Sequence, residues 1–340
     1  MSEVKRQEDH GGVFRVAIDD GLAQVKLVGE FPDGTVRALK FRNSVRSGAA
    51  GAVMSMTGEA LDQYVTEEGN TFSCSDSIST EESRFPGFHV SEIDRVLIRH
   101  ALSTAGYGGL RVHLLTSLPV DEYYRAGVRD QRRIDQKMAN LMKGVVKPGN
   151  QDAPPELETV RVGCQAISAF FDYIMDDDGA LMMAPPDAVA IVDIGGSTTD
   201  IAVVLNGDRI DAVASGAIRN GVLDVHAAVA TKLARQVESD LRLSPRQLDE
   251  ACRTRRIKLW GEQRDVGSIV DEAVQEVGST IAREIERKIG VGATLDRVVF
   301  TGGGAALFAD TLSRWRNTET IKDGEFANAR GLLKFARSQG

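Results

Sequence analysis

Two stretches of the chain, 13–30 and 189–205, share one pattern of apolar and polar positions. Each begins with an apolar strand that ends at an aspartate, turns at glycine and continues as a second apolar strand. The aspartates, Asp19 and Asp193, lie almost half a chain length apart. The pattern predicts two similar hairpins and suggests a duplicated domain.

Between and after the hairpins, apolar residues recur at helical spacing. Ser91, followed by an acidic residue at 94, can cap the first turn of one such helix. We expect helices at 91–106, 132–144, 165–177, 222–238, 268–290 and 326–339. Strands alternating with these helices predict an α/β fold. Residues 31–90, rich in glycine, serine, threonine and charge, predict a small irregular subdomain inserted in the first half.

Composition narrows the choice of partners and compartment. The 340 residues carry a net charge of −8, which disfavours direct DNA binding by the whole surface. Absence of a long apolar run predicts no membrane span, and the polar first residues do not resemble a signal peptide. Three cysteines without metal-site spacing suit a reducing cytoplasm. A basic run, Arg129, Arg132, Arg133 and Lys137, is expected to form a solvated helix face, with a contact between copies in a filament as the alternative.

Three glycine-rich turns follow apolar strands and supply the candidate chemistry. The turns are Asp19-Asp20-Gly21, Asp193-Ile194-Gly195-Gly196-Ser197-Thr198 and Thr301-Gly302-Gly303-Gly304-Ala305. Glycine lets successive backbone N–H groups approach an anion, and a carboxylate at a strand end can hold a hydrated Mg²⁺. Lys26 could add a cationic contact. Together these groups indicate a nucleoside triphosphate site. A single glycine-rich hairpin tip would usually mean only that the backbone of the turn requires glycine.

Other nucleotide motifs do not fit the chain. The P-loop motif is missing, and "GGGAAL" breaks the spacing of a dinucleotide-binding loop. The layout instead resembles the actin-like ATPase superfamily, and within it the ParM (StbA) plasmid-segregation family. This resemblance rests on "IDDG…VKL" at 18–27, "HALSTAG" at 100–106, "LPVDEYY" at 118–124, "DIGGSTTDI" at 193–201, "TGGGA" at 301–305 and the Asn-x-x-Gly step at 328–331.

The resemblance implies two ribonuclease-H-like (actin-like) lobes around a central nucleotide cleft. It places domain I at 13–185, with the insert at about 31–90, completed by the C-terminal helix at about 326–340. Domain II is then 186–325. The implied activity is hydrolysis of ATP, or of GTP, with Mg²⁺, coupled to assembly of the chain into filaments. A DNA-binding adaptor on a plasmid centromere-like site would connect the filament to DNA.

The resemblance also assigns individual residues. Asp19 and Asp193 would hold Mg²⁺ through water and take part in catalysis with Gln165, which would orient the attacking water. Family relatives carry Glu at that position, and actin carries Gln. The expected nucleotide contacts are Asp20, Gly21, Leu22, Lys26, Gly195, Gly196, Ser197, Thr198, Gly302, Gly303, Gly304 and Ala305. Leu22 departs from the Ser or Thr of the family, so the first hairpin is expected to bind phosphate through its backbone.

Alternatives remain open on the sequence alone. Gln165 could simply cap a helix. The chain could be a small-molecule kinase of the same superfamily, although no catalytic aspartate for that reaction stands out. It could also be a chaperone-type or reactivating ATPase, but only a few dozen residues follow "TGGGA".

Overall fold

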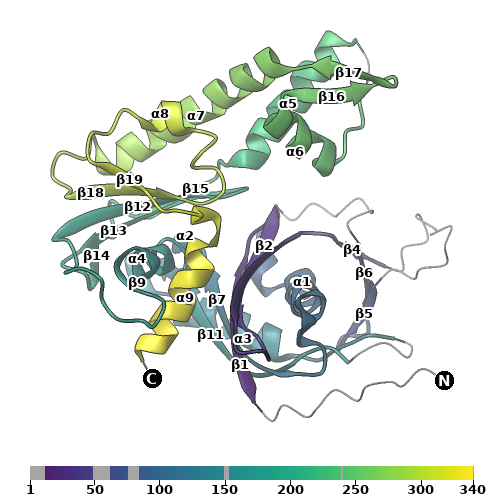
Figure 1. Ribbon diagram of the computed structural model, residues 1–340, viewed down its shortest axis with the longest axis vertical. Helices are drawn as coiled ribbons and strands as arrows, with labels where there is room; N and C mark the ends of the chain where they lie inside the picture. Colours follow the sequence, from purple (N-terminus) through teal and green to yellow (C-terminus); the bar gives the residue numbers. More distant parts are fainter. Residues whose placement is uncertain (1–11, 49–61, 76–83, 149–152, 239, 340) are drawn as a thin grey trace.

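Two mixed β-sheets organise the protein, as the computed structural model shows for residues 12–48, 62–75, 84–148, 153–238 and 240–339 (Figure 1). Within these residues the first sheet has five strands in the order β11-β7-β1-β2-β3. Its strands are β1 (Val13–Asp20), β2 (Gln24–Glu30), β3 (Val36–Arg42), β7 (Arg111–Leu118) and β11 (Glu156–Cys164). β1 pairs antiparallel with β2 and parallel with β7, and β7 pairs parallel with β11.

The second sheet repeats this topology. In the described part of the chain its order is β14-β13-β12-β18-β19, with β15 also paired to β13. The strands are β12 (Ala188–Ile194), β13 (Thr199–Leu205), β14 (Arg209–Ile210), β15 (Gly216–Ile218), β18 (Arg297–Thr301) and β19 (Thr318–Thr320). β12 pairs antiparallel with β13 and parallel with β18, which pairs parallel with β19. The two predicted hairpins are therefore the equivalent central strands of two similar sheets.

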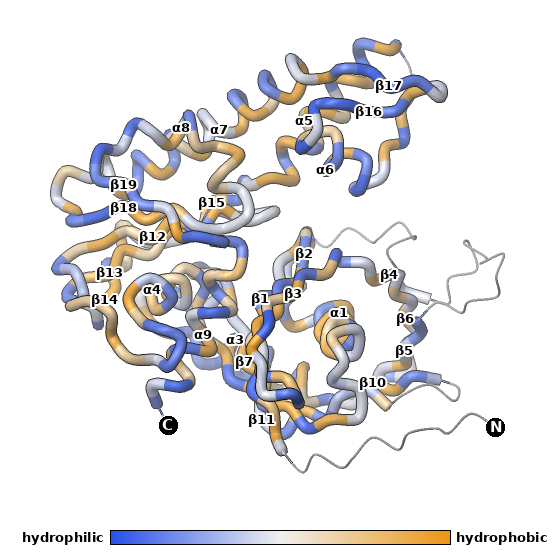
Figure 2. The backbone as a smooth tube through the Cα atoms, in the orientation of Figure 1, coloured by the Kyte–Doolittle hydropathy of each residue, from blue (hydrophilic) through white to orange (hydrophobic). Residues whose placement is uncertain are grey.

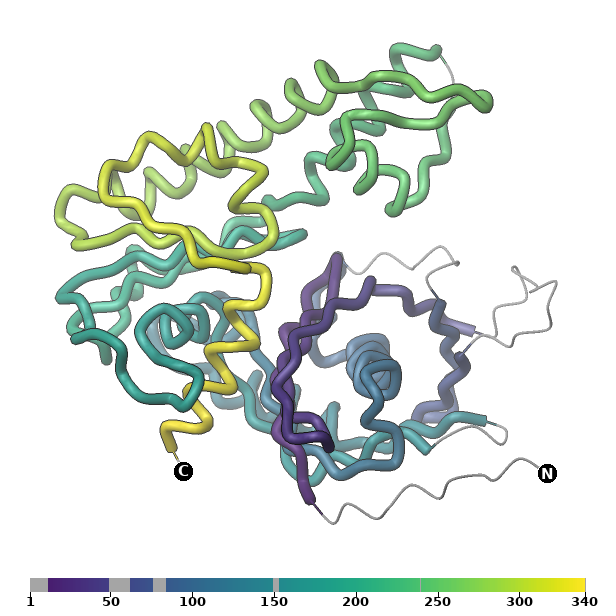
Figure 3. The backbone as a smooth tube through the Cα atoms, in the orientation of Figure 1, coloured from purple at the N-terminus to yellow at the C-terminus, as the bar shows by residue number. Residues whose placement is uncertain are grey.

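Two helices, α4 (Ile167–Ile174) and α9 (Ala327–Ser338), pack on each other between the sheets, and Figure 3 shows the C-terminal helix beside the N-terminal strands. α9 covers one face of the first sheet, where Leu332 and Leu333 meet Ala17. α4 covers one face of the second sheet. The helices approach closely at Gly331, where a Cβ atom would lie 1.7 Å from the Ser168 carbonyl oxygen.

The outer faces of the sheets are covered by other helices. α1 (Glu92–Leu102) packs on the first sheet, and Ser91 Oγ accepts from the Asp94 N–H at its start, as predicted. α5 (Val222–Gln236) and α7 (Gly267–Ile289) cover the second sheet. The remaining elements are η1 (Phe88–Val90), η2 (Ser103–Tyr107), α2 (Val120–Tyr123), β8 (Tyr124–Arg125), β9 (Val128–Arg129), α3 (Gln131–Met142), α6 (Pro245–Thr254), β16 (Arg256–Leu259), β17 (Glu262–Asp265), α8 (Ala309–Leu312) and η3 (Gly324–Phe326).

The expected insert at 31–90 starts later than predicted. β3 lies within that stretch but is the edge strand of the first sheet, paired along its length with β2. A separate small sheet follows, in the order β10-β5-β6-β4 among the described residues: β4 (Val45–Ser47), β5 (Asp62–Thr66), β6 (Thr71–Cys74) and β10 (Val145–Val146). This small sheet packs on α1, whose hydrophobic residues are orange in Figure 2. Residues 49–61 and 76–83 of the predicted insert lie outside the described part.

The strands of the first sheet fall between residues 13 and 164, and those of the second between 188 and 320. The fold is thus α/β with two sheet-centred lobes, and the elements agree with the alternation expected from the sequence. The domain limits at 185/186 and 325/326, with the C-terminal helix assigned to the first domain, stay a prediction.

Candidate functional site

The first hairpin brings a lysine and an aspartate together at the cleft. Asp19 and Lys26 are paired across β1 and β2, and Lys26 Nζ donates to Asp19 Oδ2 over 3.3 Å. Burial alone would lower the pKa of Lys26, but the charges of Asp19 and Asp193 raise it above its ordinary value. Lys26 therefore stays positively charged at the point where the sequence predicts phosphate.

Asp20 corrects one prediction, because it does not line the cleft. Successive side chains of a strand point to opposite faces, so Asp20 points with Ile18 toward α1 and α3, while Asp19 points with Ala17 toward the inter-sheet layer. Asp20 is fully buried, pairs with Lys137 Nζ and accepts from Thr116 Oγ1 at 2.6 Å. Burial alone would raise the pKa of Asp20, but the positive charge of Lys137 holds that pKa well below its ordinary value. Its role is to anchor the hairpin from behind.

The second hairpin meets the first at their glycine-rich tips. A Cβ atom on Gly196 would lie 2.5 Å from the Ala23 side chain, so only glycine permits this approach. Ser197 and Thr198 line the same cavity as Gly21 and Leu22. The two opposed turns thereby line one space.

The triple-glycine turn closes on the end of β12, where the Gly304 N–H donates to the Ile194 carbonyl over 2.9 Å. Gly302, Gly303 and Gly304 line the cleft, and their contact with a nucleotide stays a prediction. Ala305 lines neither cavity, because its side chain is buried in the core of the second lobe, so its predicted contact could come only from the backbone.

Gln165 lies beside the two carboxylates, between the end of β11 and the start of α4. Its Nε2 donates to Asp19 Oδ1 over 3.2 Å. Asn328, at the start of α9, donates from Nδ2 to Asp193 Oδ2 (2.7 Å) and accepts from the Ala166 N–H (3.1 Å). Burial, together with the negative charge of Asp19, raises the pKa of Asp193 to about 6. Two carboxylates and two side-chain amides therefore converge where α4 and α9 begin.

These residues lie in one continuous cleft made of two cavities. A cavity of about 460 Å³ is lined by Asp19, Asp193 and Gln165, and one of about 1020 Å³ extends past Phe41, His226 and Asp249. The two share five lining residues: Lys26, Gly195, Gly196, Gly303 and Glu325. The smaller cavity has room for phosphates, and the larger has room for a nucleoside.

The carboxylates fit a magnesium ion that is held mainly by a substrate. Mg²⁺ is usually bound by one or two carboxylates together with substrate phosphates and water. In the described residues no three His, Cys, Asp or Glu side chains gather into a ready-made metal site. Asp19 and Asp193 supply two carboxylates, which fits a site where substrate phosphates and water would complete the coordination of Mg²⁺.

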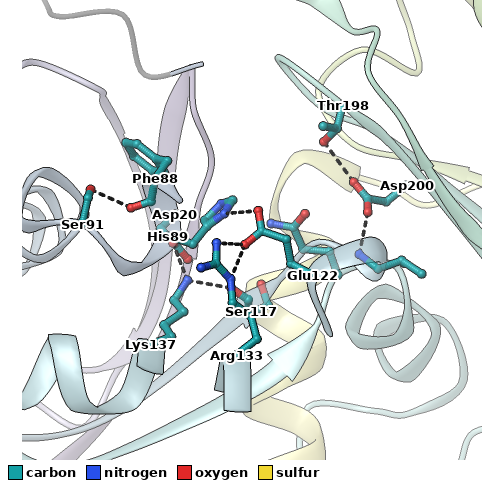
Figure 4. Close-up of polar contacts among 12 residues, drawn as sticks. Asp20, Phe88, His89, Ser91, Ser117, Glu122, Arg133, Lys137, Thr198 and Asp200 are labelled. Atoms are coloured by element: carbon teal, nitrogen blue, oxygen red, sulfur yellow. Dashed lines mark hydrogen bonds and ion pairs between the residues drawn. The ribbon is translucent and has the colours of Figure 1, made fainter. Parts of the chain in front are cut away.

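Several polar residues around the cleft were not predicted. Figure 4 shows Glu122 between His89 and Arg133, with 3.1 Å from Glu122 Oε1 to His89 Nδ1 and 2.8 Å from Glu122 Oε2 to Arg133 Nε. Lys137 donates to Asp20 and to the Ser117 carbonyl. Arg133 and Lys137 are thus engaged in ion pairs, and the expected solvated basic face is wrong for both. Lys137 pairs with Asp20 from a distant segment, whereas Glu122 lies only 11 residues before Arg133; composition and spacing reveal neither pair.

Asp200 connects the two lobes beside the second hairpin. It accepts from the Val120 N–H at 2.8 Å and from Thr198 Oγ1 at 2.9 Å. Figure 4 shows the contact with Thr198. Burial raises the pKa of Asp200 to about 7. The sequence motif contained this aspartate, but only its contact with the first lobe distinguishes it from a turn residue.

Comparisons with known proteins bear on this arrangement. Residues 14–175 match the family model for the N-terminal part of the plasmid segregation protein ParM, and residues 191–314 match that for the C-terminal part of the archaeal MreB-like actin homologue. No curated protein sequence matches the chain. The two models match successive parts of the chain. The N-terminal part of the chain is therefore similar to ParM, and the C-terminal part is similar to the archaeal MreB-like actin homologue.

Solved structures of actin-like proteins superpose over almost the whole chain. Ta0583, an archaeal actin homologue in complex with ADP, is 18% identical with a TM-score of 0.74, covering 96% of this chain and 99% of its own. A 15-stranded ParM filament from Clostridium botulinum gives 18% identity and a TM-score of 0.75 with the same coverage. Bacillus thuringiensis ParM with ATP gives 12% and 0.66, covering 94% and 97%. At these identities the likeness establishes the actin-like fold.

One further property concerns membranes. Among the residues described, the structure contains no helix with both the length and the apolar character to cross a bilayer.

Proposed function

We propose that this actin-like protein binds and hydrolyses ATP with Mg²⁺ in the cleft and that nucleotide binding drives its assembly into filaments. The convergence of Asp19, Asp193 and Gln165 between two glycine-rich hairpins is the observation that supports this most directly. The nucleotide complexes and the filament of its structural relatives favour the same function.

Each group has a distinct task in this proposal. The opposed turns donate backbone N–H groups to the phosphates, and Lys26 adds positive charge. A side-chain amide such as Gln165 can accept from and donate to a water, which places the water in line with the terminal phosphate without a change of charge. Asp19 and Asp193 would hold Mg²⁺, which when bound neutralises charge on the phosphate oxygens.

The remaining steps concern assembly. The nucleotide occupies a cleft between the lobes, so its presence sets their relative orientation and hence the fit between successive copies of the chain. Identical heterologous contacts that do not close produce an open helical filament. We further propose that such filaments segregate plasmid DNA in the cytoplasm through a DNA-binding adaptor, because the chain itself is acidic.

The test uses Gln165→Ala, with Gln131→Ala on the exposed start of α3 as matched control. With Mg²⁺-ATP, wild type and control should release phosphate, pellet as filaments and then disassemble. Gln165→Ala should bind ATP and form filaments, but its phosphate release should fall by roughly ten- to a thousandfold, as for loss of one positioned group.

Three outcomes count against parts of the proposal. Wild-type protein that stays monomeric with ATP and with GTP would contradict filament formation. Unchanged phosphate release in Gln165→Ala would leave this residue a structural role at the start of α4. Slow release with unchanged filament lifetime would separate hydrolysis from disassembly.

A further inference from the structure

An arginine of the first lobe reaches across the cleft to the second hairpin. Arg84 stands in the segment that leads to η1 and α1. Its Nε donates to Ser197 Oγ over 2.7 Å, and its Nη1 lies 2.9 Å from Asp224 Oδ1 in the first turn of α5. Ser197 belongs to the proposed phosphate-binding turn, so a guanidinium from one lobe touches the anion site of the other.

Arg84 also lines the smaller cavity, together with Asp19, Gln165 and Asp193. That cavity is rich in carboxylates, and Lys26, one of its cations, is already engaged by Asp19. A terminal phosphate bound there needs further positive charge from the protein. Arg84 is placed to supply it, because its guanidinium already contacts the turn that would hold that phosphate.

The present partner of Arg84 is replaceable. The Arg84 and Asp224 side chains are 31% and 24% exposed, and partly solvated ion pairs contribute little stability. Asp224 has a second partner, since its Oδ2 accepts from the Gly221 N–H over 2.8 Å at the start of α5. Asp224 therefore keeps a hydrogen bond when Arg84 moves to a stronger anion.

We propose that Arg84 binds the terminal phosphate of the nucleotide, exchanging Asp224 for a phosphate oxygen, and stabilises the charge that develops during hydrolysis. This inference rests on the proposed ATPase function and identifies a catalytic residue for it. Guanidinium suits the task, because its planar donors match two phosphate oxygens at once. An arginine in this position also links the phosphate state of the cleft to the contact between the lobes.

A purely structural role makes different predictions. If Arg84 only ties the lobes together through Asp224, then removing either partner breaks the same ion pair, and Arg84→Ala and Asp224→Asn behave alike. If Arg84 binds phosphate, Asp224→Asn frees the guanidinium, and only Arg84→Ala impairs the reaction. Asn at 224 retains an oxygen that can accept from Gly221.

The experiment measures ATP and ADP affinity and single-turnover phosphate release with Mg²⁺. The variants are Arg84→Ala, Arg84→Lys and Asp224→Asn. Arg314→Ala is the matched control, since it removes a similar arginine–carboxylate pair at the surface, Arg314–Glu286 at 3.2 Å, outside both cavities. Thermal unfolding of each variant without nucleotide reports whether the fold is kept.

We expect Arg84→Ala to weaken ATP about ten- to a hundredfold while ADP affinity changes little, because ADP lacks the phosphate in question. Phosphate release should slow at least about a hundredfold. Arg84→Lys should recover part of the ATP affinity but little of the rate, and Asp224→Asn and Arg314→Ala should hydrolyse ATP like wild type.

Two results would overturn the inference while leaving the ATPase function intact. One is equal loss of ATP and ADP affinity in Arg84→Ala, matched by Asp224→Asn; the other is normal phosphate release in Arg84→Ala. Wild-type protein that neither binds nor hydrolyses a nucleotide would overturn both the inference and the function on which it rests.

Discussion

Replacing Asp193 by asparagine should make the nucleotide-free protein more stable. Asp193 is 8% exposed, and its one hydrogen bond described at the cleft comes from Asn328. Burial and the neighbouring Asp19 raise its pKa from the ordinary 3.8 to about 6, so the folded protein disfavours its charged form. Asparagine keeps the shape and an oxygen that can accept from Asn328, but carries no charge.

The size of the effect follows from the difference in pKa between the folded and unfolded chain. At about 1.4 kcal/mol for each pH unit, the charged Asp193 costs up to about 3 kcal/mol of folding free energy. The folded chain binds more protons than the unfolded one between about pH 4 and pH 6. The cost therefore grows as the pH rises through this window, and it is complete above pH 6.

Thermal and urea unfolding of both proteins without nucleotide, at pH 4.5, 6 and 7.5, would measure this. The stability advantage of Asp193→Asn over wild type should be smallest at pH 4.5, close to its full size at pH 6 and little larger at pH 7.5. With Mg²⁺-ATP, wild type should instead be the more stable of the two proteins. Ligand binding stabilises the folded state, and the variant has lost a magnesium-binding carboxylate. Asp208→Asn, at a side chain that is 76% exposed, is the control and should show no such pH dependence.

The reasoning fails if Asp193→Asn is as stable as wild type, or less stable, at pH 7.5 without nucleotide. It also fails if any gain in stability does not depend on pH, because the argument attributes the gain to removal of a titrating charge. Equal stabilisation of both proteins by Mg²⁺-ATP would contradict the magnesium role while leaving the electrostatic argument in place.

Two further predictions concern the supports of the site. Lys137→Met leaves the Asp20 carboxylate buried without its ion pair, which should lower the free energy of unfolding in urea by about 3–5 kcal/mol. The double variant with Asp20→Asn should recover most of this stability, and no recovery would contradict the pairing. Gly331→Ala places a Cβ atom against the Ser168 carbonyl and should lower the free energy of unfolding by about 1–3 kcal/mol. The control Gly144→Ala should change stability little, because its new Cβ atom would lie 3.6 Å from the nearest other atom. Similar melting temperatures of the two variants would refute the close contact at Gly331.

Local sequence pattern was sufficient to predict the α/β class, both hairpins and the cap at Ser91. These features depend on neighbours within a few residues, where apolar alternation, helical spacing and glycine act directly on the backbone. The two aspartates at the strand ends could be proposed for the same reason, whereas Gln165 was proposed from the resemblance to the actin-like family. The element missed most clearly is β3: its short segment, VRALKFR, was grouped with the glycine- and serine-rich stretch that follows, and its membership of the first sheet depends on pairing with β2.

Tertiary structure decided which polar residues face the cleft. Asp19 and Asp20 are adjacent and chemically identical, yet one lines the cavity and the other is buried beside Lys137, because only packing determines what covers each face of β1. Asn328 and Arg84 are far in sequence from Asp193 and Ser197, which they contact. No local pattern encodes those contacts, because each joins residues more than a hundred positions apart that only the packing of the two lobes brings together.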